Sequence, residues 1–94
     1  MITKSRKRGY FMNKLTKQNL RTNNLKLECS LENEYTAHFE VYCGTDHLGT
    51  LSLYPDGHVV PKAHCDLFYV QEAYHEIKKY AKNHGMEKTN LDFL

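Results

Sequence analysis

The chain has 94 residues, 40% of them hydrophobic, and a formal net charge of +2, which suits one domain with a modest core. Its apolar runs are too short to span a membrane, and its polar, basic opening does not have the pattern of a secretory signal peptide. Three cysteines, an odd number, argue against a closed disulfide framework and favour a reduced, cytoplasmic setting.

Basic residues are concentrated at the N-terminal end. Residues 1–26 carry eight basic residues and no acidic one, whereas residues 27–94 carry five lysines and eleven acidic residues. Such an arm is typical either of a flexible, solvated terminus or of nucleic-acid binding. We predict a mostly flexible segment over residues 1–24. The nucleic-acid alternative would use Lys4, Arg6, Lys7, Arg8, Lys14, Lys17 and Arg21.

The start of the chain has two candidate positions. Residues Lys7 to Met12 match what a purine-rich ribosome-binding site and its spacer would give if they were translated in frame. A start at Met12 would mean that residues 1–11 are not native, and it would indicate a bacterial or phage origin. The remaining chain would have nine basic and eleven acidic residues, which weakens the electrostatic case for nucleic acid.

A single α+β domain is expected over residues 25–94. Alternating apolar residues predict strands at 25–31, 35–43 and 49–55. The Asp-Gly pair at 56–57 predicts a tight hairpin turn into a short strand at 58–60. Val70, Ala73, Tyr74, Ile77 and Ala81 recur at helical spacing, between a candidate N-cap at Asp66 and a candidate stop at Gly85.

These elements predict a small antiparallel three- to four-stranded meander that is packed on one face by a single C-terminal helix. Residues 89–94 either add a last strand or pack on the core. The order of three strands and a helix resembles that of double-stranded-RNA-binding domains. The helix of that family begins with a lysine cluster, whereas this one opens with Asp66-Leu67-Phe68-Tyr69, so the resemblance does not extend to the residues that contact RNA.

A second set of residues is expected on the sheet face away from the helix. Loops at 32–34 and 44–48 would place Cys29 opposite Ala37 and Phe39 opposite Leu53. Tyrosines and a histidine on such a face favour contact with a partner protein, although cross-strand pairs also simply stabilise sheets. In this register three pairs form the outer face, His38 with Tyr54, Glu40 with Ser52 and Tyr42 with Thr50.

The binding residues that we predict are Tyr42, Tyr54, His38 and Thr50, together with Phe68 on the helix. The six histidines and three cysteines contain no CxxC or HxxxH pair, so we predict no metal site, no cofactor and no catalytic residue. The pair His64-Cys65 and a convergence of His38 with His58 are the remaining catalytic candidates.

We therefore predict a small, non-enzymatic, intracellular interaction protein. It would be an accessory or inhibitory factor of bacterial or phage type that binds a host or partner protein. The alternatives are a nucleic-acid-binding protein that uses the basic arm and a histidine-based hydrolase or metal-dependent enzyme. A homodimer formed through the open face or an edge strand is a further alternative.

Overall fold

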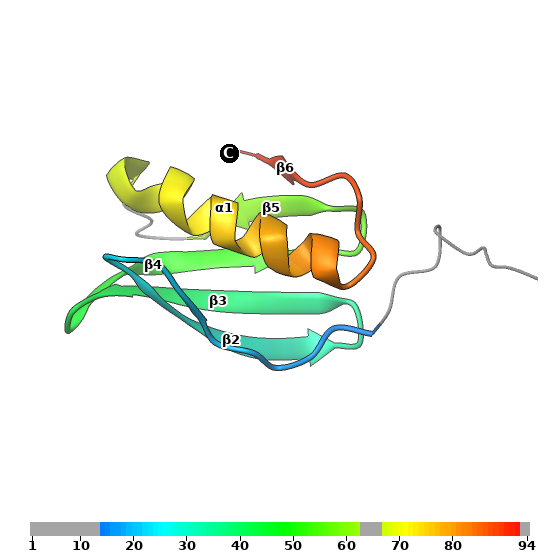
Figure 1. The fold of residues 1–94 in the computed structure, drawn as a ribbon, viewed down its shortest axis with the longest axis horizontal. Coiled ribbons are helices and arrows are strands. Elements are labelled where there is room, and N and C mark those ends of the chain that lie inside the picture. Colours follow the sequence, from blue (N-terminus) through cyan, green and yellow to red (C-terminus); the bar gives the residue numbers. More distant parts are fainter. Residues whose placement is uncertain (1–13, 63–66, 93–94) are drawn as a thin grey trace, which may run out of the picture.

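A curled sheet wraps one face around a single helix in the computed structural model, which describes residues 14–62 and 67–92 (Figure 1). The sheet order over the described residues is β1-β2-β3-β4-β5-β6, antiparallel throughout except for the parallel pair β5–β6. The elements are β1 (Leu20–Arg21), β2 (Lys26–Asn33), β3 (Thr36–Cys43), β4 (Asp46–Leu53), β5 (His58–Pro61), α1 (Leu67–Asn83) and β6 (Asn90–Leu91).

The predicted α+β class, with an antiparallel meander and one C-terminal helix, is confirmed. The strand count was wrong, because the two-residue strands β1 and β6 extend the sheet to six strands. Strands of two residues carry too little alternation to be recognised in a sequence. No helix among the described residues is long and apolar enough to cross a membrane.

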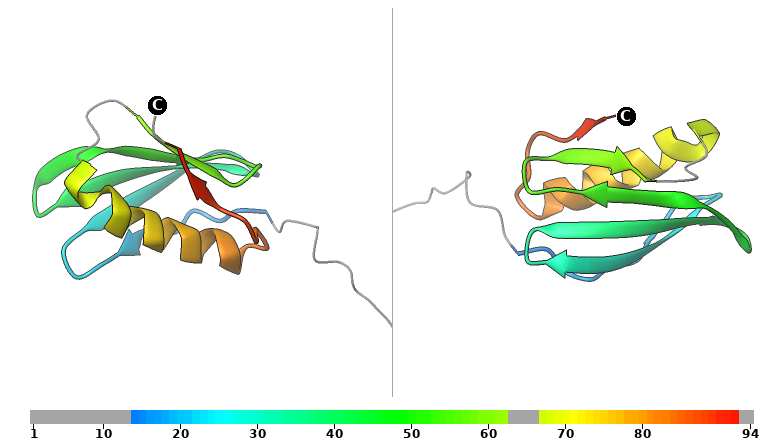
Figure 2. Two further views of the ribbon diagram at one scale, coloured as in Figure 1. Left: turned by 90° about the horizontal axis from the view of Figure 1, so that it is seen from above. Right: turned by 180° about the vertical axis from the view of Figure 1, so that it is seen from behind.

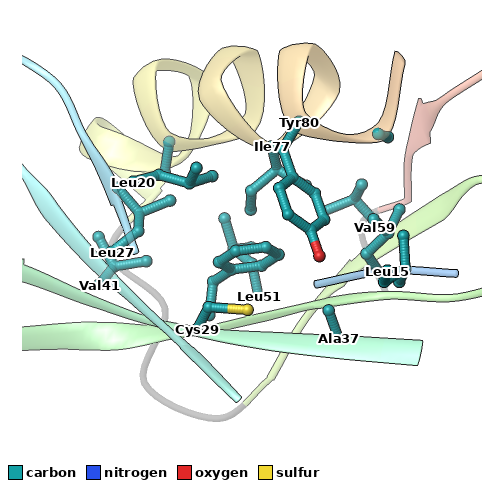
Figure 3. Packing of buried hydrophobic residues seen from close by; sticks show 14 of the residues in the cluster. Leu15, Leu20, Leu27, Cys29, Ala37, Val41, Leu51, Val59, Ile77 and Tyr80 are labelled. Carbon is teal, nitrogen blue, oxygen red and sulfur yellow. The ribbon is translucent and has the colours of Figure 1, made fainter. Parts of the chain in front are cut away.

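The core lies between the inner face of the sheet and α1 (Figure 3). Phe39, Leu51 and Leu53 are fully buried on the central strands, and Ile77 is fully buried on the helix. The helix ends at the predicted glycine, where Gly85 has a φ of 88°. Gly85 N donates to Lys82 O and Met86 N donates to Ala81 O, which is the pattern of a Schellman motif. The predicted N-cap, Asp66, lies outside the described residues.

The strand pairing keeps the predicted faces but shifts the predicted register by two residues. Cys29 pairs with Phe39 instead of Ala37, and Phe39 pairs with Leu51 instead of Leu53. The turns are shorter than expected and occupy only residues 34–35 and 44–45. Each hairpin also contains a register shift, next to Leu31 in one and next to Val41 in the other. A shift of two leaves every side chain on its expected face because the strand period is two.

The N-terminal strap, defined here as residues 14–21, closes the side of the core between β2 and α1. Leu15 and Leu20 are 4% and 9% exposed and belong to the core cluster. Leu15 N donates to Glu34 O at 2.9 Å, and Asn19 Oδ1 accepts from the amide of Cys29 at 2.9 Å. This part of the segment expected to be flexible therefore packs with the domain through two buried leucines and two hydrogen bonds.

Candidate functional site

The outer face of the sheet, defined here as the surface of β2–β5 opposite α1, is covered by no other described element (Figure 2). Its polar residues are alternate residues of each strand, as predicted, because residues that pair across neighbouring strands lie on the same face. The face carries Lys26, Glu28, Ser30 and Glu32 from β2, His38, Glu40 and Tyr42 from β3, and His47, Thr50 and Ser52 from β4. Val60 of β5 pairs with Ser52.

Tyr42 lies at the end of this face that adjoins the turn at 44–45. Its cross-strand partner is His47 rather than Thr50, and the centroids of the two rings are 5.1 Å apart. The ammonium of Lys26 lies 5.7 Å from the centroid of the Tyr42 ring. A ring held between a cation and an imidazole is restrained before any partner binds, which lowers the entropic cost of binding.

Glu40 joins this end of the face to its centre. One carboxylate oxygen accepts from His47 Nε2 at 2.6 Å, and the other accepts from the hydroxyl of Thr50 at 3.1 Å. Across the sheet Glu40 lies directly opposite Glu28. Two carboxylates in opposite positions repel each other, and only Glu28 has a lysine partner, Lys26 at 3.3 Å.

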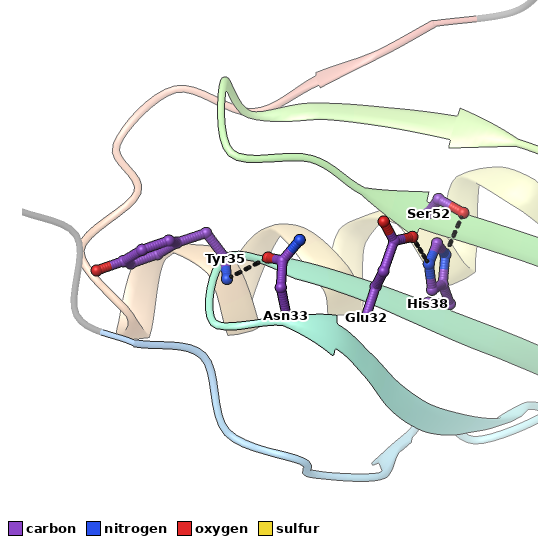
Figure 4. A network of polar contacts seen from close by, with 5 residues as sticks. All are labelled: Glu32, Asn33, Tyr35, His38 and Ser52. Carbon is purple, nitrogen blue, oxygen red and sulfur yellow. Dashed lines mark hydrogen bonds and ion pairs between the residues drawn. The ribbon is translucent and has the colours of Figure 1, made fainter.

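His38 lies at the centre of the face, between a hydroxyl and a carboxylate (Figure 4). His38 Nδ1 is 2.7 Å from Ser52 Oγ, and His38 Nε2 is 2.8 Å from Glu32 Oε1. Because a carboxylate can only accept, Nε2 donates to Glu32 and, in the neutral imidazole, Nδ1 accepts from Ser52. The expected pairing of His38 with Tyr54 is wrong, since Ser52 is its partner on β4.

This arrangement has the connectivity of a serine–histidine–acid triad, but its geometry favours a structural role. Ser52 is 0% exposed, so no substrate carbonyl can reach its hydroxyl without rearrangement of the sheet. The serine also contacts Nδ1 and the acid contacts Nε2, the reverse of the usual arrangement in serine hydrolases. A buried hydroxyl needs a hydrogen-bond partner, and the imidazole supplies it.

Tyr54 lies beyond the opposite end of β4 from the turn at 44–45, so the two tyrosines do not form one platform. Its ring is 5.5 Å from the ammonium of Lys62. Thr50 is part of the cluster around Glu40. Phe68, the predicted contact on the helix, is 84% exposed in the first turn of α1, and its ring centroid is 5.0 Å from that of Tyr69. It lies on the helical layer, apart from the outer face.

Comparison with protein-family models, with curated proteins and with solved structures found no match to this chain. The outer face therefore has to be interpreted from its own chemistry. Sequence reasoning missed the participation of His47 and Glu32 in this face. A two-residue turn at 44–45 would have placed His47 opposite Tyr42, and that turn is compatible with Gly44, whose φ is +62°.

The basic residues of the predicted arm are only partly described. Lys4, Arg6, Lys7 and Arg8 lie outside the described residues. Lys14 pairs with Glu34 at 2.9 Å, and the hydrogen bond with that carboxylate raises the pKa of Lys14. Lys17 is exposed, and Arg21 lies opposite Lys26 in the β1–β2 pair.

His58 and His84 have separate partners. His58 Nδ1 lies 3.2 Å from Asp56 and 3.3 Å from Asp92, while His84 contacts Thr16 and the backbone of the helix. The catalytic pair His64-Cys65 falls outside the described residues. Within the described residues, no group of three or more potential ligands could hold a metal ion.

Proposed function

We propose that this protein is a non-enzymatic interaction protein, acting as an accessory or inhibitory factor, that binds a partner protein through the outer face of its sheet. The observation that carries the proposal is the acidic pair Glu28 and Glu40, directly opposite each other beside the restrained ring of Tyr42. Like charges in this position cost stability in the free protein. A basic side chain from a partner would remove that cost on binding.

Charge on the face supports a basic partner segment. The face carries Glu28, Glu32 and Glu40, with Lys26 and Lys62 as its cations. With neutral histidines the balance is therefore negative, which favours a positively charged segment through complementarity. Tyrosine next to this charge supplies contact area with few rotatable bonds.

Both alternative functions are less well supported by the same residues. A nucleic acid would meet the three carboxylates of the face, which repel phosphates. A hydrolase would need an accessible nucleophile, and Ser52 is fully buried beside the imidazole that it contacts.

The partner can be identified with a photo-crosslinking residue placed at Thr50 in cells of the source organism, and its binding can then be measured with purified proteins. We expect Tyr42→Ala and Glu40→Gln to weaken binding at least about tenfold. Glu87→Gln is the matched control, because Glu87 is exposed and follows the helix. Circular dichroism establishes that each variant is folded.

Two results would contradict the proposal. One is a partner that binds the folded Tyr42→Ala/Tyr54→Ala double variant with unchanged affinity. The other is crosslinking at Thr50 that recovers nucleic acid instead of protein.

A further inference from the structure

The register places two cations, a tyrosine and a histidine in one row across four strands. Arg21 of β1 pairs with Lys26 of β2, Lys26 pairs with Tyr42 of β3, and Tyr42 pairs with His47 of β4. Beside this row is an open cleft of about 520 Å³ between the β1–β2 turn and Gly44. We propose that this cleft binds a compact phosphate group, with Arg21 and Lys26 as its principal ligands.

Positive charge on the lining of the cleft is the first observation that points to an anion, and the nearest helix carboxylate, Glu72, lies at its edge, 3.5 Å from Asn24 Nδ2. Arg21 and Lys26 are the charged residues that line the cleft, and none of its lining residues is acidic. Arg21 makes no ion pair with any residue in the described part of the chain. Like charges in opposite positions destabilise a strand pair, so a bound dianion would remove a repulsion that the free protein contains.

The contact between Lys26 and Glu28 does not prevent this role. The two groups are 3.3 Å apart, and each side chain is 45% exposed. An exposed ion pair of this kind contributes little to stability. Lys26 can therefore turn toward a doubly charged phosphate at small cost.

Hydrogen-bonding groups of the turn favour phosphate over a simple halide. Thr22 Oγ1 accepts from the amides of Asn24 and Leu25, which leaves its hydroxyl proton available to a ligand oxygen. Asn23, which has an amide side chain, also lines the cleft. The guanidinium of Arg21 can bind two phosphate oxygens at once, a geometry that a spherical anion cannot use.

The neighbouring row limits the ligand to a compact anion. Glu28 and Glu40 lie opposite each other one row further along the same strands, about 7 Å away by strand geometry. A polyphosphate backbone that continued along the strands would meet these carboxylates. A single phosphate or phosphate monoester occupies the first row alone. Lys26 and Tyr42 also belong to the outer face, but the observations that point to a phosphate come from the lining of the cleft and do not depend on the proposed protein partner.

Titration of the isotope-labelled protein with inorganic phosphate and with phenyl phosphate, followed by nuclear magnetic resonance at constant ionic strength, tests the proposal. We expect saturable shifts of the amides of Asn23 and Asn24 with one or both anions. Arg21→Gln and Lys26→Gln should weaken binding about tenfold or more, which is the loss expected for one charged hydrogen-bonding partner. Lys17→Gln, the same charge change at an exposed position of the strap, should leave affinity within about twofold.

The two anions distinguish the sources of the phosphate. Tighter binding of phenyl phosphate assigns the cleft to organic phosphates whose ring contacts Tyr42 or His47, and equal binding assigns it to the phosphate group itself. The absence of saturation with either anion up to tens of millimolar would overturn the proposal. Equal weakening by Lys17→Gln and Arg21→Gln would also overturn it, because that result indicates only general charge attraction. Arg21→Gln should not lower the midpoint temperature of unfolding of the free protein, whereas the substitution would lower it if Arg21 had a purely structural role.

Discussion

Tyr80 attaches the helix to the N-terminal strap, and Tyr80→Phe removes that attachment while keeping the packing of the ring. The residue is 2% exposed, and its hydroxyl donates to Thr16 O at 2.7 Å. Its ring meets Phe39 edge to face with centroids 5.3 Å apart, a contact that phenylalanine retains. At neutral pH we expect the variant to lose about 1 kcal/mol of unfolding free energy, the net value of one such hydrogen bond.

The same hydroxyl makes the difference in unfolding free energy between wild type and Tyr80→Phe depend on pH. Burial, with a smaller contribution from Cys29, raises the pKa of Tyr80 from 10.0 to about 12. The folded protein therefore favours the protonated hydroxyl, and this contribution is fully present below pH 10 and is lost as the pH rises through 12. The wild type loses about 3 kcal/mol of unfolding free energy when this contribution is gone completely, and it has lost between about 1 and 2 kcal/mol by about pH 11. Wild type and Tyr80→Phe should thus become equally stable near pH 11.

Urea unfolding at pH 8, 10 and 11 measures this difference, with circular dichroism as the signal because the chain has no tryptophan. Other titrating groups occur in both proteins and cancel in the comparison to first order. Tyr35→Phe is the control, since Tyr35 lies in an exposed turn. A stability difference between wild type and Tyr80→Phe that stays constant from pH 8 to pH 11 would refute the reasoning.

Three further outcomes follow from the packing and hydrogen bonds. Gly57→Ala should cost at least about 3 kcal/mol in urea unfolding, because Gly57 has a φ of +91° and its new Cβ would lie 2.0 Å from the carbonyl oxygen of Lys88. Gly44→Ala, with a φ of +62° and no atom within 4 Å of its Cβ, should cost only about 1 kcal/mol, and equal losses would contradict this explanation. Ser52 should not react with a fluorophosphonate probe in the folded protein, and labelling measured by intact mass would show that its hydroxyl is accessible. Asn19→Ala should lower the unfolding free energy by about 1 kcal/mol through loss of its bond to a β2 amide, and an unchanged midpoint would show that water replaces the bond.

The sequence predicted on which face of the sheet each side chain lies, but it did not predict which residues pair across neighbouring strands. Alternation along β3 correctly separated Phe39 from His38 and Glu40, because a strand has only two faces. Register depends on turn length, and the turns at 34–35 and 44–45 are each a residue or more shorter than expected. The outer-face residues were therefore mostly identified in advance, but Tyr42 was assigned Thr50 as its partner instead of His47.

The strap could not be predicted for a different reason. Between Lys14 and Arg21 only Leu15 and Leu20 are apolar, which fits neither a helical nor a strand period. Its attachment depends on distant groups, the hydroxyl of Tyr80 and the amide of Cys29. Such long-range partners are invisible to local patterns, so a polar segment that closes a core has the same sequence signature as a flexible one.

Like charges oppose each other in two neighbouring rows of the sheet, first Arg21 with Lys26 and then Glu28 with Glu40. Exchanging one member of each row would create two opposite-charge pairs, so this arrangement is not the one that favours stability most. Two contacts between described residues cross the two rows, Lys26 with Glu28 at 3.3 Å and His47 with Glu40 at 2.6 Å. All four side chains are partly exposed, so these contacts offset little of the repulsion. A surface that retains such repulsion gains more binding free energy from a ligand of opposite charge than a neutralised surface does. The basic row suits an anion and the acidic row suits a cationic side chain, so the two proposed ligands can occupy adjacent rows without competing for the same charge.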